Sequence, residues 1–489
     1  MVTGVLIAIA FALLLARLFC RNPENYPPGP FPWPIVGNLY LLRDLSRKLK
    51  AQHFALLKLS QQYDSPVISL RLGGNNVIAV SGLEGIHEVL NGEEFDGRPW
   101  NEFIKLRNMG LKKGITMADG PEWKEIRAWV VKSLKNSGFG RPEMSDMIKS
   151  ELAQTLETLK KGGVFRLKPI VGAAVINVLW TFVAGKEISN TINRFQNLME
   201  RRAAIFDMSG GILSSFPWIR YVAPEWSGYN ILVTMNNELK NVIVETIEDH
   251  KRNYVAGSEA DLIDMFLTEI YARNGDSTVY TEEQLILILV DLFIASLHTS
   301  TLTLDFLFLN MAMNLDQQRR LHQELDNVLE KESLPELSDR PKLPYIEAVL
   351  AESQRISLVV PIIGPRRVLK DTKLLGYSIP KDTSVLINIF SIHMDPTLFP
   401  EPEVFKPERF LKNGAYQPDD NIMPFGKGKR RCPGEALARA ALFLIFAGIM
   451  QRFEIRPVPG KEPLTREIIP GITLSPKPYE VLLVPRHTS

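Results

Sequence analysis

Cys432 is one of only two cysteines in the 489-residue chain, and it lies in a short basic segment before a predicted helix. The segment, Phe425-Gly-Lys-Gly-Lys-Arg-Arg-Cys-Pro-Gly434, has glycines that let the backbone approach a flat ligand and four cations before the sulfur. We expect the helix N-terminus and these cations to lower the pKa of the Cys432 thiol from about 8.5. No second cysteine or histidine is close enough in sequence for a structural zinc site, whereas a single thiolate can ligate haem iron. The alternative is an ordinary buried cysteine in a basic loop.

The segment resembles the cysteine-loop signature of the cytochrome P-450 family, Phe-x-x-Gly-x-Arg-x-Cys-x-Gly. Five positions match at the required spacing: Phe425, Gly428, Arg430, Cys432 and Gly434. The resemblance implies that Cys432 is the axial ligand of haem iron and that Arg430 meets a haem propionate. It also implies that electrons come from NADPH through a separate flavoprotein reductase, with a small b-type haem protein as a possible second donor.

Four further side chains are candidates for binding the two haem carboxylates. Trp123 and Arg127 lie one helical turn apart and match the family's Trp-x-x-x-Arg element, although an amphipathic surface helix explains their spacing equally well. Arg98, in Phe-Asp-Gly-Arg-Pro, matches another propionate-binding arginine, and Arg366 stands where many relatives carry a histidine. Two carboxylates require several convergent cations, so such a set is physically expected.

Glu352 and Arg355 are three residues apart and share one face of a predicted helix. Alone they would form a surface pair worth ~0.5 kcal/mol or less. They match the family's Glu-x-x-Arg motif, whose third member would be Arg409. The resemblance implies a buried ion network with a structural role, in which loss of one partner leaves an uncompensated charge.

A long apolar segment, 285–309, is predicted to form a buried central helix. Within it, Ala295 and Thr299 match the family's oxygen-activating helix, where the threonine hydroxyl would deliver protons to the reacting oxygen. Ser296 replaces the usual glycine and His298 replaces the usual acid. Two alternatives stay open, namely that Thr299 bonds the carbonyl of Ala295 and that His298 is a packed histidine without a role in proton transfer.

The resemblance also implies a lipophilic substrate pocket and a docking surface. The pocket candidates are small or apolar side chains that ordinary core packing would explain as well: Ile294, Ala295, Thr299, Val360, Pro361, Ile362, Ile363, Ile472 and Thr473. Lys427, Lys429 and Arg431 surround the cysteine. They are either solvated surface cations or a docking patch for an acidic flavoprotein reductase.

The overall composition excludes several classes of protein. Lys and Arg total 57 against 55 Asp and Glu, a net charge of +2, so nothing indicates a nucleic-acid partner. Two cysteines exclude a disulfide framework and suit a reducing compartment. A hydrophobic content of 45% is ample for a large core.

The N-terminal residues, 1–20, are predicted to form a membrane anchor, because residues 4–16 are an unbroken apolar run. No charge precedes the run, and Arg17 and Arg21 follow it, which favours an uncleaved anchor over a signal peptide and places the rest of the chain in the cytosol. A proline-rich hinge, 21–38, follows, and residues 39–489 form the expected haem-thiolate catalytic domain. The expected location is the endoplasmic reticulum membrane.

The periodicity predicts a mainly helical α+β fold with small sheets. Residues 67–72 and 76–80 are expected to form a hairpin, and residues 472–484 a final hairpin. The family resemblance implies the same fold.

We therefore expect a microsomal haem-thiolate monooxygenase that hydroxylates or epoxidises a lipophilic small molecule with O2. The chain resembles insect members near the branch that processes juvenile hormone and other hormones, so hormones, terpenoids, fatty-acid derivatives and xenobiotics are the candidate substrates. Two other functions stay open: a haem-thiolate isomerase or dehydratase that needs no reductase, and a non-enzymatic haem- or lipid-binding protein.

Overall fold

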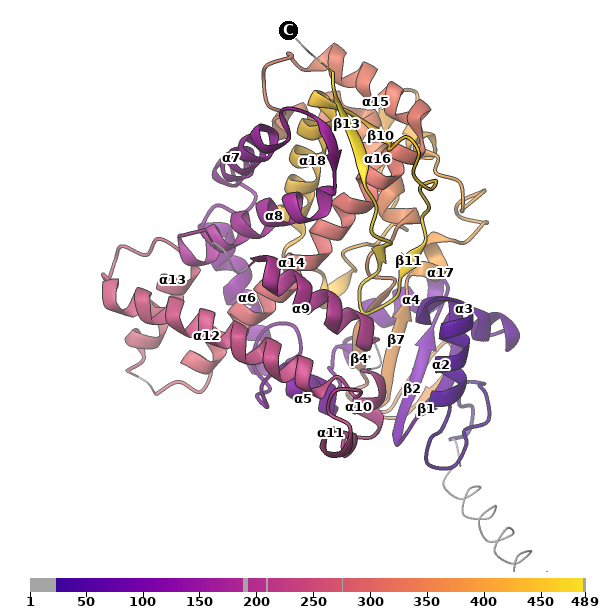
Figure 1. Cartoon of the computed structure of the whole chain (residues 1–489). Helices are drawn as coiled ribbons and strands as arrows, with labels where there is room; N and C mark the ends of the chain where they lie inside the picture. The colour runs from indigo at the N-terminus through magenta and orange to yellow at the C-terminus, as the bar shows by residue number, and fades with distance from the viewer. Residues whose placement is uncertain (1–22, 188–191, 208–209, 275, 487–489) are drawn as a thin grey trace, which may run out of the picture.

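The computed structural model describes residues 23–187, 192–207, 210–274 and 276–486, so the predicted anchor, 1–20, lies outside the described residues. Helices dominate the described chain and small sheets lie at its edges, which confirms the predicted fold class. The molecule has a roughly triangular outline, with most helices on one side and the largest sheet at an opposite corner (Figure 1).

The described α-helices are α2 (Leu39–Lys48), α3 (Gln52–Gln62), α4 (Leu83–Asn91), α5 (Glu102–Arg107), α6 (Pro121–Asn136), α7 (Pro142–Leu159), α8 (Leu167–Ala184), α9 (Ile192–Ile205), α10 (Gly211–Ser215), α11 (Ile219–Val222), α12 (Tyr229–Asn253), α13 (Leu262–Ala272), α14 (Glu282–Met313), α15 (Leu315–Val328), α16 (Pro344–Ile356), α17 (Phe390–His393) and α18 (Glu435–Arg452). The strands are β1 (Val67–Leu72), β2 (Asn75–Val80), β3 (Gly163–Phe165), β4 (Ile362–Arg367), β5 (Thr372–Leu374), β6 (Tyr377–Ile379), β7 (Ser384–Asn388), β8 (Leu411–Lys412), β9 (Ala415–Tyr416), β10 (Phe453–Pro457), β11 (Ile468–Ile469), β12 (Ser475–Pro476) and β13 (Val481–Pro485).

Helix α14 is the axis of the fold because it is apolar on nearly every side. Most of its residues are buried, and α8, α12, α16 and α18 pack around it. Thr281 caps its N-terminus by accepting a hydrogen bond from the backbone N–H of Gln284 at 3.2 Å. Among the described helices, α8 and α14 are long and apolar enough to cross a membrane, but 67% and 72% of their apolar windows are buried inside the protein. Both therefore serve as core helices, and the predicted central helix over 285–309 is observed.

The largest sheet has the strand order β1-β2-β7-β4, in which β2 and β7 are parallel and the other pairs antiparallel. Successive side chains along its strands belong alternately to two buried hydrophobic clusters, one on each face of the sheet. Val67 and Val385 belong to the cluster on one face, whereas Ile68 and Leu386 belong to the cluster on the other, beside α2 and α3. Both faces are thus covered, which is why these strands are almost continuously apolar.

The predicted hairpin at 67–80 is present as β1 and β2, with Val67 opposite Val80. The predicted final hairpin over 472–484 is wrong. Strand β12 pairs with β11, and β13 pairs with β10 and β3 instead. The local pattern indicated extended chain correctly, but the pairing partners come from distant segments.

The described part of the proline-rich hinge, 23–38, packs along the edge strand β1. The backbone N–H of Ser69 donates to the carbonyl of Pro28 at 2.7 Å, and the Asn38 side chain accepts from the N–H of Arg71 at 2.8 Å. A Cβ on Gly29 would lie 2.0 Å from the Ser69 carbonyl oxygen, so this close approach requires glycine. The hinge is therefore attached to the sheet rather than extended in solvent.

Glu352, Arg355 and Arg409 meet in one buried ion network. Arg355 donates two hydrogen bonds to the Glu352 carboxylate at 2.7 and 2.8 Å, and Arg409 Nε donates to it at 3.2 Å. Arg355 also donates to the carbonyls of His393 and Pro402, both at 2.8 Å. The Glu352 and Arg355 side chains are fully buried, so α16 is joined to the segment before α18 through a compensated charge cluster.

Arg355→Met should lower the free energy of unfolding by about 3–5 kcal/mol, because it leaves Glu352 buried without its bidentate partner. Arg319 and Asp316 form a pair of the same i,i+3 spacing on the surface of α15, with side chains 69% and 82% exposed. The control Arg319→Met should change stability by less than ~1 kcal/mol. Chemical denaturation of both variants measures the difference, and equal losses would contradict the structural role of the network.

Candidate functional site

Cys432 ends a tight loop directly before α18. Its backbone N–H donates to the carbonyl of Phe425 at 2.9 Å, which closes the loop around a short 3-10 turn, Gly428–Arg430. Gly428 has a φ of +71°, and a Cβ there would lie 2.2 Å from the carbonyl oxygen of Leu90. The loop can therefore pack against α4 only if this position is glycine.

Burial raises the pKa of the Cys432 thiol above its ordinary value. The charge of Glu435 acts in the same direction, whereas the Gly434 backbone hydrogen bond and the charges of Arg127 and Arg431 oppose it without compensating. The expectation of a lowered pKa was therefore wrong for the protein chain alone, because desolvation outweighs the helix N-terminus and the cations. A coordinated metal ion would supply the further positive charge that a thiolate here requires.

Beside the cysteine loop, the structure brings together Arg98, Arg127, Arg366 and Arg430, which come from four separate segments. Arg98, Arg366 and Arg430 are each less than 10% exposed. Burial, followed by the charges of the other three arginines, lowers the pKa of Arg98, and burial together with Arg366 lowers the pKa of Arg430 to about 9. In the part of the chain that the structure describes, only one ion pair joins this set to a carboxylate, Arg366 to Asp96 at 2.9 Å. The cluster thus carries an excess of positive charge.

Backbone carbonyls set the orientation of the Arg98 and Arg430 guanidinium groups. Arg98 donates to Gly364 and Pro365 at 2.6 and 2.7 Å, and Arg430 donates to the carbonyls of Asp96 and Ala118. The Nε atoms of Arg98 and Arg366 are buried and have no hydrogen-bond partner. These orphaned donors are what an anion with several oxygens would satisfy.

Trp123 contacts this cluster differently from the prediction. The Arg430 guanidinium lies 3.3 Å from the centre of the Trp123 ring. The indole N–H, however, donates to the carbonyl of Ile115 at 2.9 Å, and Arg127 donates to the carbonyl of Arg431. The indole donor is therefore engaged by the backbone rather than directed at a ligand, and Trp123 supports Arg430 by stacking.

Ala295 and Thr299 lie on the face of α14 that borders a cavity, as their spacing predicted. The Thr299 hydroxyl donates to the carbonyl of Ala295 at 2.8 Å, and Ser296 donates to the carbonyl of Phe293 at 3.1 Å. The alternative that Thr299 makes a hydrogen bond within its own helix is thus observed. The same hydrogen bond fixes the orientation of the Thr299 hydroxyl at the cavity wall.

His298 is 3% exposed, and its Nδ1 lies 2.9 Å from the Thr473 hydroxyl. Its Nε2 is buried without a partner. Burial, aided by the charge of Lys168, lowers the pKa of His298 to about 4. The imidazole is therefore neutral at cellular pH and does not titrate there, which favours the alternative of a packed histidine.

The cavity at this face has a volume of about 230 Å³. The predicted residues that line it are Ile294, Ala295, His298, Thr299, Val360, Ile472 and Thr473. Pro361, Ile362 and Ile363 do not line it. Ile362 is 2% exposed and packs in the cluster beside α3, and Ile363 packs against the cluster on the opposite face of the sheet. Strand β4 directs these two side chains into the sheet's own cores.

Several lining residues come from segments that carry no motif. Helices α5 and α9, with the chain after each, contribute Phe103, Ile104, Arg107, Thr116, Met117, Met199, Arg202 and Asp207. No local pattern in these segments indicates them. Arg107, for example, forms a buried ion pair with Asp291 of α14.

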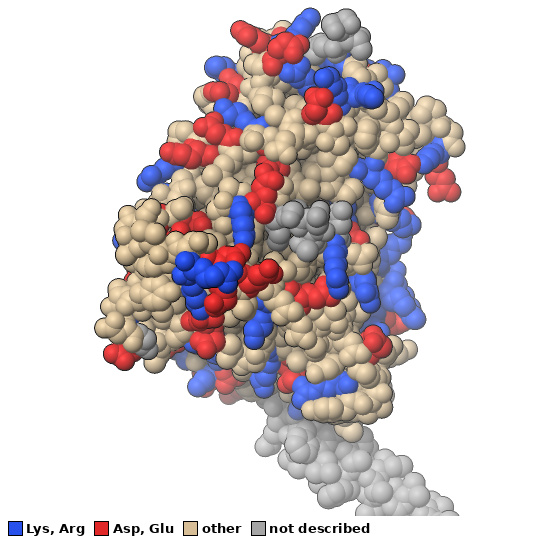
Figure 2. Space-filling view, turned by 60° about the vertical axis from the view of Figure 1, so that its left-hand side comes forward, with Lys and Arg blue, Asp and Glu red and all other residues tan. Residues whose placement is uncertain are grey.

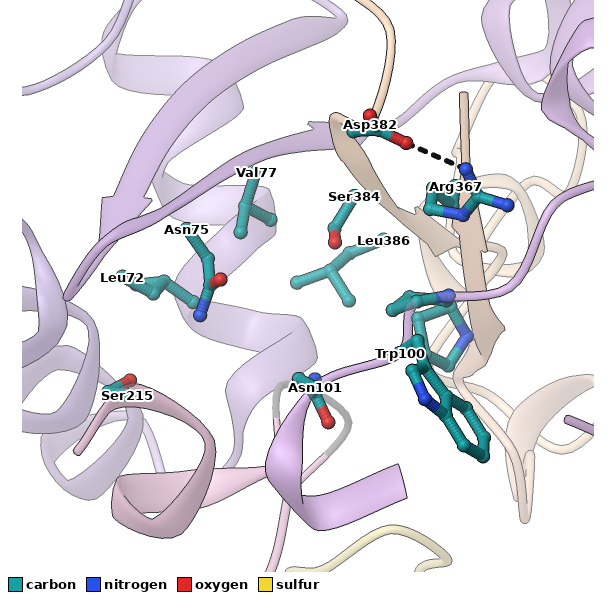
Figure 3. A pocket seen from close by; sticks show the side chains of 12 residues that line it. Leu72, Asn75, Val77, Trp100, Asn101, Ser215, Arg367, Asp382, Ser384 and Leu386 are labelled. Atoms are coloured by element: carbon teal, nitrogen blue, oxygen red, sulfur yellow. Dashed lines mark hydrogen bonds and ion pairs between the residues drawn. The ribbon is translucent and has the colours of Figure 1, made fainter. Parts of the chain in front are cut away.

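A separate cavity of about 160 Å³ lies between one face of the largest sheet and the end of α10, with Trp100 and Asn101 on one side (Figure 3). An ion pair between Arg367 and Asp382, at 2.7 Å, closes one end. The cavity contains none of the predicted site residues, and it shares only Pro365 with the larger one.

The surface beside the cysteine loop is basic. An open hollow there is lined by Lys124, Arg127, Lys132, Lys135, Arg141 and Lys429. Lys429 pairs with Glu93, and Arg431 pairs with Glu435 at 2.5 Å. On the face shown in Figure 2, by contrast, basic and acidic side chains are interspersed.

The Cytochrome P450 family model matches residues 27–483 of the chain. The chain belongs to the cytochrome P450 family. It is 38% identical to probable cytochrome P450 305a1 of Drosophila melanogaster, over 98% of each chain, and 38% identical to farnesoate epoxidase of Bombyx mori, over 99% of each chain. It is 32% identical to cytochrome P450 2J2 of Homo sapiens, over 98% of this chain and 95% of that protein. This cytochrome P450 is accordingly a haem-dependent monooxygenase, as the sequence predicted.

The residues present fit haem. Its two propionates would compensate the excess charge of the arginine cluster and satisfy the orphaned Nε atoms of Arg98 and Arg366. The same cluster lies beside the cysteine loop, and Arg127 acts electrostatically on both Cys432 and Arg98. A thiol that burial keeps protonated in the bare chain also suits a ligand that brings its own metal cation.

Gly428→Ala should destabilise this cytochrome P450 by about 1–3 kcal/mol or more and lower its haem content, because the new Cβ meets the Leu90 carbonyl. Gly414 has a similar φ of +78° but open space around it, so Gly414→Ala is a matched control for the backbone strain alone. Haem absorbance per protein and thermal unfolding measure both effects. Equal haem content in the two variants would contradict the packing of the loop against α4.

Proposed function

We propose that this cytochrome P450 hydroxylates or epoxidises a lipophilic small molecule at a membrane, with electrons delivered from NADPH by a flavoprotein reductase. The supporting observation is the cavity of about 230 Å³, where largely apolar side chains surround the α14 face that carries Thr299. An apolar enclosure with a few polar groups is what binds and orients a lipophilic substrate.

The residues of the cysteine loop and the four arginines beside it have proposed parts in this reaction. Cys432 would ligate the haem iron, and Arg98, Arg127, Arg366 and Arg430 would hold the haem carboxylates. Phe425 and Gly434 shape the loop on either side of the cysteine: the Phe425 carbonyl accepts the Cys432 N–H, and Gly434 precedes α18. Bound haem activates O2, and its thiolate ligand favours O–O cleavage.

The protein's own contribution lies on α14. Because the Thr299 hydroxyl donates to the Ala295 carbonyl, its oxygen is left to accept a hydrogen bond from the cavity. Rotation about the Cβ–Oγ1 bond moves the hydroxyl proton from that carbonyl toward the cavity, which lets Thr299 pass this proton on while its oxygen takes up another from the donor that it accepts there. His298 stays neutral and holds the Thr473 hydroxyl, so we assign it a positioning role rather than proton relay.

The substrate class follows from the cavity and the relatives. Phe103, Ile104 and Val360 provide apolar walls. One relative, identical at 38% of positions, is named as a farnesoate epoxidase. Both observations support a terpenoid or fatty-acid-derived substrate, and xenobiotics of similar lipophilicity would also fit the walls.

Membrane attachment is proposed through residues 1–20 as the anchor and residues 21–38 as the hinge, with residues 39–489 as the cytosolic catalytic domain on the endoplasmic reticulum. Large aromatic side chains support it. Phe31 and Trp33 in the hinge are each 66% exposed, and Trp226 is 56% exposed. Arg43 lies 5.6 Å from the centre of the Trp226 ring, so α2 and the segment after α11 are neighbours. Exposed aromatics of this kind suit a lipid interface.

The reductase is proposed to dock at the basic hollow beside the cysteine loop. Lys124, Lys132, Lys135, Arg141 and Lys429 give that hollow one sign of charge. An acidic partner would be steered there electrostatically. A small b-type haem donor with an acidic surface would fit the same place.

The reduced, carbon-monoxide-bound protein should show the Soret red shift of thiolate-ligated haem, and Cys432→Ala should abolish it. Cys20→Ala is the control and should leave the spectrum unchanged. With reductase present, the wild type should form oxygenated product in proportion to NADPH consumed. Product formed from a hydroperoxide without reductase would favour the isomerase or dehydratase, and a normal thiolate spectrum in Cys432→Ala would refute the ligand assignment.

Thr299→Ala should raise the hydrogen peroxide released per NADPH consumed while leaving haem content intact, because it removes the proton-transferring hydroxyl from the cavity. His298→Gln should leave that ratio unchanged, since the imidazole does not titrate near pH 7. Product, peroxide and NADPH are measured together in both variants. Increased peroxide release in His298→Gln would restore the relay interpretation, and unchanged release in Thr299→Ala would remove the hydroxyl from the mechanism.

A further inference from the structure

Arg202, on α9, lines the cavity that contains Thr299, and it is only 7% exposed. No ion pair joins it to any carboxylate among the described residues. Its guanidinium contacts the Met199 sulfur at 3.7 Å and lies 5.8 Å from the centre of the Phe103 ring. Its Nε is buried and has no hydrogen-bond partner in the part of the chain that the structure describes. A buried cation with such weak compensation costs stability, so its place in a cavity wall indicates a missing anionic partner.

The other arginine in the same wall shows what compensation looks like here. Arg107 forms a buried ion pair with Asp291, whose second oxygen accepts the backbone N–H groups of Ile115 and Thr116 at 2.7 and 2.8 Å. Both oxygens of the Asp291 carboxylate therefore already have hydrogen-bond partners on α5 and on the chain that follows it. Burial, followed by the positive charge of Arg107, lowers the pKa of Arg202 to about 9, which still leaves the guanidinium charged at pH 7.

The cavity also contains one acidic side chain, Asp207. Its carboxylate accepts the backbone N–H of Gly211 at 3.3 Å, at the start of α10. It is not ion-paired with Arg202 within the described chain. The remaining walls near Arg202 are apolar, formed by Phe103, Ile104 and Met199. Among the described lining residues, an incoming ligand would thus find one cation without an ion-paired carboxylate, in a mostly hydrocarbon enclosure.

We propose that Arg202 anchors the carboxylate of a lipophilic organic acid, whose hydrocarbon chain fills the apolar cavity and extends to Thr299. This inference rests on the proposed monooxygenase function and narrows its substrate class to acids. A guanidinium presents paired N–H donors that match the two oxygens of a carboxylate. Fixing the acid end at α9 would direct oxidation to carbons distant from the carboxyl group, so Arg202 would determine both specificity and position of attack.

Paired probes test the anchor on the haem-loaded protein: dodecanoic acid and methyl dodecanoate, which share a chain and differ in charge. Calorimetry and the ligand-induced Soret shift measure binding of each at pH 7.5. The wild type should bind the acid roughly 10- to 100-fold more tightly than the ester, as a charge-assisted hydrogen-bonded pair implies. Arg202→Met should abolish this preference by weakening only the acid, and Arg202→Lys should keep part of it.

Arg201 provides the matched control, because it is the adjacent residue, is exposed, and does not line this cavity. Arg201→Met should retain the preference for the acid. Thermal unfolding without ligand gives an independent readout. Arg202→Met should not lower the unfolding temperature, because it removes an uncompensated buried charge, whereas a purely structural arginine would lower it.

Equal affinity of the wild type for acid and ester, failure to bind either, or an intact preference in Arg202→Met would overturn the anchor. These outcomes are separable from failure of the proposed function. One outcome is a thiolate spectrum and NADPH-dependent oxidation of an uncharged substrate, with no preference for the acid. This outcome would support the monooxygenase function and reject Arg202 as the anchor. Absence of the thiolate spectrum would reject the proposed function itself.

Discussion

Burial of α14 is the constraint on which the rest of the structure depends. A helix that is apolar on nearly every side must be surrounded, and α8, α12, α16 and α18 surround it. The few exceptions to its burial, such as Ile294, Ala295 and Thr299, fall where the cavity begins. The reacting face is thus defined by the places where packing against the central helix stops, and its rigidity comes from the same burial that stabilises the fold.

This cytochrome P450 contains two clusters of buried charged side chains, and they differ in how their charge is compensated. The Glu352 carboxylate accepts two hydrogen bonds from Arg355 and one from Arg409. The charge of this network is therefore compensated within the protein, and the network supports the fold. The arginines beside Cys432 have Asp96 as their one ion-paired carboxylate in the described chain. Because uncompensated buried charge is costly, the second cluster is stabilised fully only when an anionic ligand binds. Haem binding and folding stability should therefore be strongly linked.

The two arginines of the cavity wall also differ in how their charge is compensated. Arg107 is neutralised by Asp291, whereas Arg202 is left with a sulfur and an aromatic ring. His298 contributes no charge, because burial keeps its imidazole neutral. The protein thus places one unpaired cation in an apolar enclosure, a stability cost that functional sites tolerate when the ligand compensates it.

The sequence by itself determined the features that depend on neighbours along the chain. The cysteine loop, the apolar helix over 285–309 and the i,i+3 spacing of Glu352 and Arg355 are local patterns, and each was identified correctly because glycine conformation and helical period are local properties. The helical face of Ala295 and Thr299 followed for the same reason.

The tertiary structure decided everything that depends on what surrounds a group. Desolvation reversed the predicted pKa shift of Cys432 and removed His298 from titration near neutral pH. Strand pairing placed Ile362 in the buried cluster on one face of the sheet, and it paired β13 with β10 and with β3, which is far away in the sequence. Arg202 carried no motif at all, because its importance lies in having no ion-paired carboxylate among the described residues, and only the packed chain determines which charges are paired.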